Sequence, residues 1–139
     1  MIPSLHDNFL VSYEVDCELR EIKLRVRRAD WAEEPLARII EFTGVQGYHF
    51  RNDAFGNVVF SLEKITLDLF FSEHSSEIAE SYHLAGAPGP WAGDMNSAQQ
   101  KLADMDVKAF VLSSSYGLSG WLLAKTFEVR EVNFPSAAK

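Results

Sequence analysis

The 139-residue chain has a single cysteine and no long hydrophobic run. Cys17 therefore has no partner for a disulfide within the chain, which excludes a disulfide-stapled scaffold and favours a cytoplasmic location. No stretch approaches the roughly 20 consecutive apolar residues that a membrane-spanning helix needs. Residues 1–7 lack the basic start and apolar run of a signal peptide, so we expect none.

The chain also lacks an excess of positive charge. Its 13 basic and 20 acidic residues give a formal net charge of −7 and a sequence pI near 5.0. Such a chain has no general electrostatic attraction for nucleic acid or an anionic membrane, so we expect neither as a partner. The exception is a basic stripe within residues 20–28, which we interpret as a charged outer strand face that discourages edge pairing. A site for a phosphate or an acidic partner is the alternative for this stripe, which comprises Arg20, Lys23, Arg25, Arg27 and Arg28.

Motifs for catalysis, metal binding and cofactor binding are missing as well. No zinc-binding spacing occurs among the four histidines, which are His6, His49, His74 and His83. Glu73, His74 and Glu77 share a face of a predicted helix, but such groups are common on solvated helices. Residues 113–121 are rich in serine and glycine but do not fit the G-x-S-x-G nucleophile elbow. No glycine-rich phosphate loop is present. We therefore predict no metal, no cofactor and no catalytic residue.

Alternation of apolar and polar residues predicts strands on both sides of a helical region. Residues 9–17 and 20–28 are predicted to form a hairpin, with Val15 opposite Leu24, a register that keeps Asp16 away from Glu21. Further strand signal covers residues 36–51, where two glycines interrupt it, and residues 58–62, 107–115 and 119–132.

The hydrophobic period becomes helical after residue 65. Residues 66–85 are predicted to be helical in two pieces, the second capped by Ser75 or Ser76, and Ser97 is predicted to cap a further short helix. Strands, then helices, then strands indicate a single α+β domain over residues 1–139. We expect a mainly antiparallel curled sheet or partial β-barrel of about six strands, with two or three short helices packed on one side.

Two groups of residues are candidates for a binding site. The loop at residues 86–93 holds Trp91 between the stiffening residues Pro88 and Pro90, and tryptophan is enriched at binding hot spots. These three residues are predicted to contact a partner, and the alternative is that Trp91 folds back and anchors its own loop to the core. The second group would line a cleft between the sheet and the helices and comprises Tyr48, His49, Arg51 and Tyr116.

Several segments resemble a group of small bacterial β-rich proteins with a domain of unknown function. The segments are residues 44–50 (GVQGYHF), 55–63 (FGNVVFSLE), 85–91 (AGAPGPW) and 109–121. Distantly similar short β-rich proteins are labelled as immunity proteins of bacterial toxin systems. The resemblance implies an acidic, single-domain, cytoplasmic inhibitor that docks on a toxin, and it implies no catalytic residue.

These observations predict a non-catalytic cytoplasmic binding protein with a protein partner, such as an immunity-type inhibitor. Two alternatives stay open. One is a small-molecule-binding protein or enzyme with a cleft between the sheet and the helices. The other is a structural homo-oligomer, such as a homodimer, that uses a strand face shared by Trp121, Leu123, Phe127 and Val129.

Overall fold

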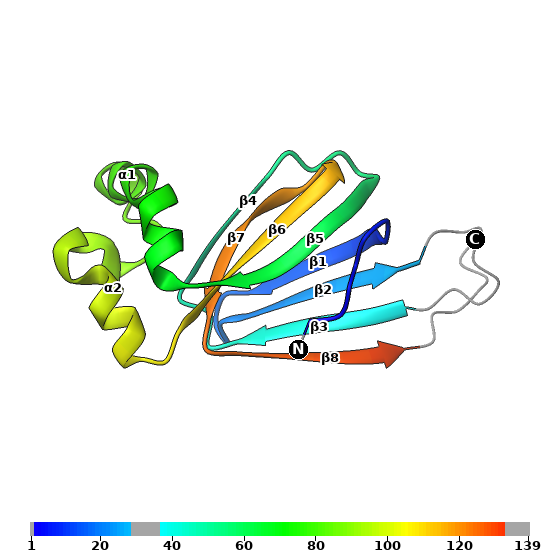
Figure 1. The fold of residues 1–139 in the computed structure, drawn as a ribbon. Coiled ribbons are helices and arrows are strands. Elements are labelled where there is room, and N and C mark those ends of the chain that lie inside the picture. The colour runs from blue at the N-terminus through cyan, green and yellow to red at the C-terminus, as the bar shows by residue number, and fades with distance from the viewer. Residues whose placement is uncertain (1, 29–36, 133–139) are drawn as a thin grey trace.

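The computed structural model describes residues 2–28 and 37–132. These residues form an antiparallel sheet of eight strands with two helices on one side, an α+β architecture (Figure 1). The strands are β1 (Phe9–Asp16), β2 (Glu21–Arg27), β3 (Ala37–Thr43), β4 (Gly47–Arg51), β5 (Asn57–Ile65), β6 (Lys108–Tyr116), β7 (Ser119–Ala124) and β8 (Thr126–Val132). Between β5 and β6 lie α1 (Leu67–Ala85), the short 3₁₀ helix η1 (Pro90–Gly93) and α2 (Met95–Asp104).

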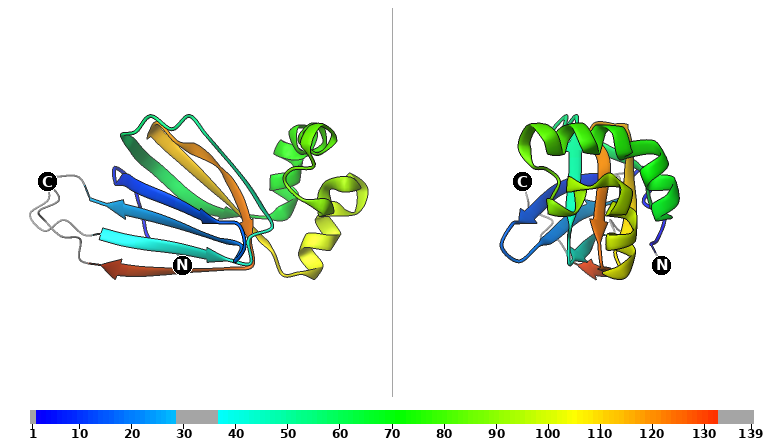
Figure 2. Two further views of the ribbon diagram at one scale, coloured as in Figure 1. Left: turned by 180° about the vertical axis from the view of Figure 1, so that it is seen from behind. Right: turned by 90° about the vertical axis from the view of Figure 1, so that its left-hand side faces the viewer.

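The sheet is strongly curled, as the sequence predicts. Its strand order is β4-β7-β6-β5-β1-β2-β3-β8, and β1 joins the two halves by pairing with both β2 and β5. The halves enclose an interior core to which β2, β3, β5, β6 and β7 all contribute buried side chains. Both helices lie at one end of this curled sheet (Figure 1 and the left view of Figure 2).

The prediction of about six strands is wrong, because two long extended segments each bend and divide. The segment at residues 36–51 divides into β3 and β4, and that at 119–132 divides into β7 and β8. The bends stay hydrogen-bonded to each other, since the Lys125 amide donates to the Thr43 carbonyl oxygen at 3.0 Å. Gly44 lies in the first bend with a φ of +64°, and an added Cβ there would be 2.8 Å from Cγ of Lys125. The close approach of the two bends thus requires glycine at this position.

Strands β6 and β7 are buried on both faces. Phe110 and Leu122 point into the interior core, whereas Trp121 and Leu123 pack with the helices in a second cluster. The strand face proposed for homo-oligomer contacts therefore does not exist as one surface. Two of its residues, Trp121 and Leu123, are covered by the helices. The chain bends at Lys125, and the other two residues, Phe127 and Val129, pack against the interior core instead.

The predicted hairpin of β1 and β2 forms, but its register differs by two residues. Tyr13 lies opposite Leu24, and Asp16 lies opposite Glu21, a pairing that like charges disfavour. The turn explains this register, because one carboxylate oxygen of Asp16 accepts the amide hydrogens of residues 18 and 19, at 3.1 and 2.9 Å. This local capping sets the hairpin connection, and the connection in turn fixes the register.

The helical region contains one long helix where the sequence predicts two pieces. The Thr66 side chain caps α1 by accepting the amide hydrogen of Leu69 at 3.1 Å, and Gly86 ends the helix in a left-handed conformation. Ser75 and Ser76 lie inside α1, and α2 is capped by Asp94 where the sequence predicts Ser97. No helix in the described part of the chain combines the length and apolar character needed to cross a membrane.

Candidate functional site

Trp91 lies inside the structure and is only 6% exposed. Its indole Nε1 donates a hydrogen bond of 2.8 Å to the carbonyl oxygen of Gln46, and its ring meets that of Phe71 edge-on, with centroids 6.2 Å apart. This geometry agrees with the alternative in which Trp91 folds back and anchors its own loop to the core. The tryptophan fastens the loop between α1 and η1 to the bend that precedes β4.

The same loop places Pro88 directly against the first residue of β4. A Cβ added to Gly47 would lie 2.9 Å from Cβ of Pro88 and 3.3 Å from Cζ2 of Trp91. The absence of a side chain at Gly47 therefore lets the loop pack on the strand backbone. Pro90 is exposed and begins η1, so it lies apart from this contact.

A hollow of about 110 Å³ opens between β4, α1 and this loop. We call it the Glu77 hollow. Three of the sequence-predicted residues line it together, Tyr48, His49 and Pro88. The remaining lining residues are Glu77, Ile78, Ser81, Ala87 and Trp121.

A hydrogen-bonded network fixes the carboxylate of the Glu77 hollow. Nδ1 of His74 lies 2.7 Å from Oε1 of Glu77, and Nε1 of Trp121 donates to the same oxygen at 3.2 Å. Because a carboxylate only accepts, Nδ1 of His74 carries the shared hydrogen. His49 stacks on Trp121, with ring centroids 6.2 Å apart and planes inclined by 29°. Both bonds use Oε1, which leaves Oε2 without a hydrogen bond from the described residues.

The network keeps Glu77 charged. Burial alone raises the pKa of the Glu77 carboxyl, but the hydrogen bonds from His74 and Trp121 and the nearby charges of His74 and His49 outweigh it. The pKa of Glu77 is therefore lowered below its ordinary value. At neutral pH the hollow therefore contains an exposed carboxylate anion that accepts hydrogen bonds from His74 and Trp121.

A second hollow of about 180 Å³ adjoins the first. We call it the hairpin hollow, because it lies between the β1–β2 turn and the start of β4. Tyr48 and Pro88 line both hollows and so form the wall between them. Its lining includes apolar side chains of the interior core and its margin, namely Val15, Ile22 and Val45. Polar and charged residues also line it, namely Asp16, Arg20, Glu21 and Gln46.

The other two predicted cleft residues lie elsewhere. Arg51 is at the far end of β4, opposite Ser119, and Tyr116 is 62% exposed at the end of β6. Neither lines the Glu77 hollow or the hairpin hollow. Of the four predicted cleft residues, Tyr48 and His49 therefore line the Glu77 hollow, whereas Arg51 and Tyr116 do not.

A hydrogen-bonded turn at residues 53–57 shapes the same distant end of the sheet. Oδ1 of Asn57, a residue that is only 4% exposed, accepts the amide hydrogens of Ala54 and Leu118 at 2.9 and 2.8 Å. The Phe55 amide, the Asn57 amide and the Tyr13 hydroxyl donate to Asp53 and lower the pKa of its carboxyl. The hydrogen bond to Asp53 conversely raises the pKa of Tyr13. These hydrogen bonds stabilise the turn at residues 53–57 and connect it to Tyr13 of β1.

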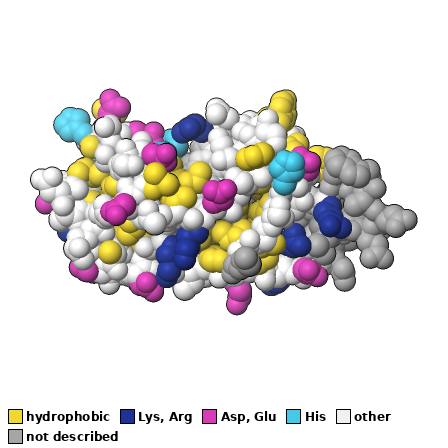
Figure 3. Space-filling model, viewed as in Figure 1, with side chains coloured by type: hydrophobic (Ala, Val, Ile, Leu, Met, Phe, Trp, Pro, Cys, Tyr) yellow, Lys and Arg dark blue, Asp and Glu magenta, His cyan; other side chains and the backbone are white. Residues whose placement is uncertain are grey.

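The helical end of the molecule, which contributes α1 to the Glu77 hollow, is acidic. Residues 66–106 contain seven acidic residues and one lysine, which gives −6 of the formal net charge of −7. All seven acidic side chains are exposed. On the face shown in Figure 3, acidic side chains are spread over the helical end of the molecule.

The sequence predicts that His74 and Glu77 share a helix face, but it indicates no role for this pair. The signal was the separation of three residues on one helix, which brings the two side chains together. Trp121, which completes the network, lies 44 residues beyond Glu77 in the chain. Only the packing of α1 on the outer face of β7 brings it there.

Within residues 2–28 and 37–132, no group of three or more histidine, cysteine, aspartate or glutamate side chains is placed to hold a metal ion. No protein-family model, curated protein or solved structure matches the chain. The resemblance to immunity proteins therefore stays a prediction.

Proposed function

We propose that the protein is a non-catalytic binding protein for a basic protein partner, and that the Glu77 hollow takes the head group of an arginine or lysine side chain of that partner. One observation carries the proposal. The hollow holds a carboxylate with an uncommitted oxygen, Oε2 of Glu77, and it is also lined by His49 and Trp121, whose rings stack on each other. A guanidinium or ammonium group gains from both a carboxylate and an aromatic face.

The size of the hollow favours a side-chain head group over a whole metabolite. Pockets for drug-sized ligands typically span about 300–1,000 Å³. The Glu77 hollow measures about 110 Å³, which suits a group of a few atoms. This argues against the alternative of a small-molecule cleft between the sheet and the helices.

Charge over the wider surface supports a basic partner. The acidic residues give the helical end of the molecule a negative field, which attracts a basic protein and speeds its association. An immunity-type inhibitor of a basic toxin would be one protein of this kind. A cytoplasmic location belongs to the same proposal and rests on the single, exposed cysteine, Cys17.

The proposal is tested by titrating ¹⁵N-labelled protein with acetyl-arginine methylamide and following the indole N–H signal of Trp121. We expect this signal and the amide signals of Tyr48 and His49 to shift and saturate in the millimolar range, as for a small fragment. Acetyl-citrulline methylamide has nearly the same shape without the charge and should shift none of them.

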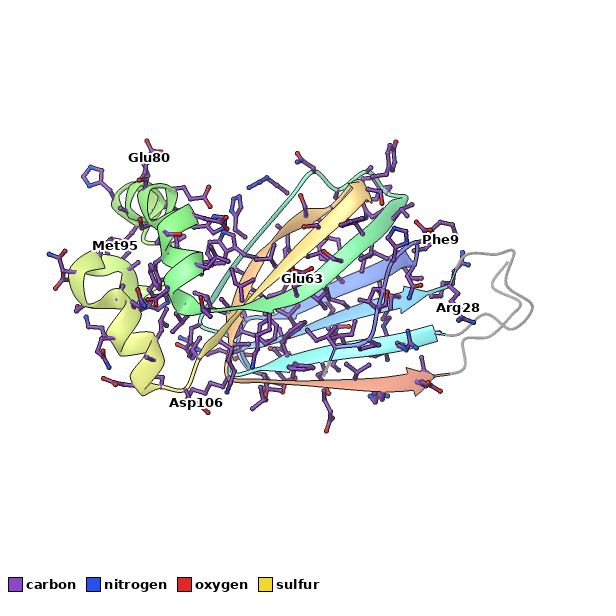
Figure 4. All side chains as sticks on the ribbon, viewed as in Figure 1. Phe9, Arg28, Glu63, Glu80, Met95 and Asp106 are labelled. Atoms are coloured by element: carbon purple, nitrogen blue, oxygen red, sulfur yellow. The ribbon has the colours of Figure 1, made fainter. Side chains whose placement is uncertain are left out.

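Protein variants provide the second control. Glu77→Gln should abolish the response to the arginine fragment. Glu80→Gln removes the same charge from the same helix, but Glu80 projects away from the sheet (Figure 4), so this variant should respond like the parent protein. Equal responses to the arginine and citrulline fragments would rule out recognition of a cation at this hollow.

A further inference from the structure

Strand β4 is an edge strand of the sheet formed by residues 2–28 and 37–132. It stands at the end of the strand order and, among these residues, pairs only with β7. Among the described residues, the backbone of residues 48–51 forms no hydrogen bond with any element other than β7. An exposed strand edge of this kind presents amide and carbonyl groups to which another chain can add.

The opposite edge of the sheet is protected, whereas β4 is not. Strand β8 has three charged residues among its seven, Glu128, Arg130 and Glu131. Charges on an edge strand oppose pairing with another chain. Strand β4 has only Arg51, at its last position, and it contains no proline. The structure therefore favours β4 over β8 as an edge that accepts a strand.

The two hollows open on opposite faces of the sheet at this edge. His49 points to the face covered by α1, where the Glu77 hollow lies. Tyr48 points to the other face, where its ring meets Phe50, and the hairpin hollow there reaches Val15 of the core margin. Adjacent residues of an extended chain also point to opposite faces.

We propose that the free edge of β4 accepts an extended segment of the basic partner as an added strand. In this segment an aliphatic residue stands next to an arginine or lysine. The aliphatic side chain occupies the hairpin hollow, and its basic neighbour occupies the Glu77 hollow. This inference rests on the proposed function and adds the form in which the partner presents its basic residue.

The test uses the synthetic peptide acetyl-Thr-Thr-Leu-Arg-Thr-Thr-amide and two N-methylated versions of it. One version is methylated at the odd-numbered backbone nitrogens and the other at the even-numbered ones. In an antiparallel pair only alternate residues hydrogen-bond to the neighbouring strand. We expect one version to bind at least tenfold more weakly than the parent peptide and the other to bind within about threefold of it. The β4 amides that point away from β7 should also become protected from hydrogen exchange when the parent peptide binds.

The outcomes separate this inference from the proposed function. Equal affinities of the two methylated peptides would overturn strand addition, and so would a peptide no tighter than the arginine fragment. In both cases the response to the arginine fragment would leave the proposed function standing. If neither the fragment nor the peptide shifts the Trp121 signal, the proposed function fails and the inference fails with it.

Discussion

The indole nitrogen of Trp91 donates a 2.8 Å hydrogen bond to the carbonyl oxygen of Gln46, 45 residues earlier in the chain. This contact connects the loop after α1 to the bend before β4. The loop borders both hollows through Pro88, and the bend borders the hairpin hollow through Val45 and Gln46. A single buried side chain therefore sets the position of Pro88, which is part of the wall that the hollows share.

Replacing the buried Trp91 side chain should therefore mainly lower the stability of the folded protein. Trp91→Ala removes a ring that is 6% exposed and should lower the free energy of unfolding by about 3–5 kcal/mol. Trp91→Phe keeps most of the ring but loses the hydrogen bond to Gln46, so it should be the milder variant. Urea denaturation followed by far-UV circular dichroism measures both. An unchanged midpoint for Trp91→Ala would mean that the side chain is exposed in solution, as the partner-contact prediction requires.

A methyl group at Gly47 should disturb the contact between the loop and the strand. Gly47→Ala places Cβ 2.9 Å from Cβ of Pro88, and a proline ring cannot rotate away. We expect a loss of about 1–3 kcal/mol in the free energy of unfolding, as for other overpacked sites. Gly56→Ala is the matched control, because an added Cβ at Gly56 meets nothing within 4 Å. Equal denaturation midpoints for the two variants would show that Pro88 does not pack on β4.

The charge of Glu77 should make stability depend on pH. Its pKa is lowered in the folded protein and returns to the ordinary value of about 4.5 on unfolding. The stabilisation is therefore fully present above pH 4.5 and is lost as the pH falls through the lower folded-state pKa. Glu77→Gln should unfold at lower urea concentration than the parent at pH 7, and the gap should narrow below about pH 4. Glu80→Gln removes a charge without breaking this network, so a gap of the same size in that variant would refute the explanation.

The buried amide of Asn57 should be the critical group of the turn at residues 53–57. Asn57→Ala leaves the amide hydrogens of Ala54 and Leu118 without their acceptor, and the Leu118 amide is buried. An unsatisfied buried donor costs about 1–3 kcal/mol. Denaturant titration gives the total loss, and hydrogen exchange at Leu118 locates it. Slow exchange at Leu118 in the variant would show that another acceptor replaces Asn57.

The sequence predicts the strands and the α+β class well, because alternation reports which face of a strand is buried. The hairpin register is predicted wrongly for a local reason, and the strand number is predicted wrongly for a non-local one. The turn after Asp16 depends on side-chain hydrogen bonds that hydrophobic patterning does not reveal. The bends at Gly44 and Lys125 depend on each other, since one chain bends where its neighbour bends.

The sequence predicts only the part of the site whose residues are neighbours in the chain. Tyr48 and His49 are adjacent in the chain, and any strand would place them together at one edge. Pro88 joins them only because Gly47 allows close packing, and Trp91 is buried although its loop composition is typical of exposed segments. The network of Glu77 and Trp121 needs contact between α1 and β7, which no local pattern specifies.

The helical region is an insertion between two strands that pair with each other. β5 and β6 are neighbours in the sheet, yet α1, η1 and α2 all lie between them in the chain. The hydrogen-bonded pairing of β5 with β6 therefore does not run through the helical layer. A different insertion that still covers Trp121 and Leu123 would give the same β4 edge a new set of neighbouring charges, and with it a different partner.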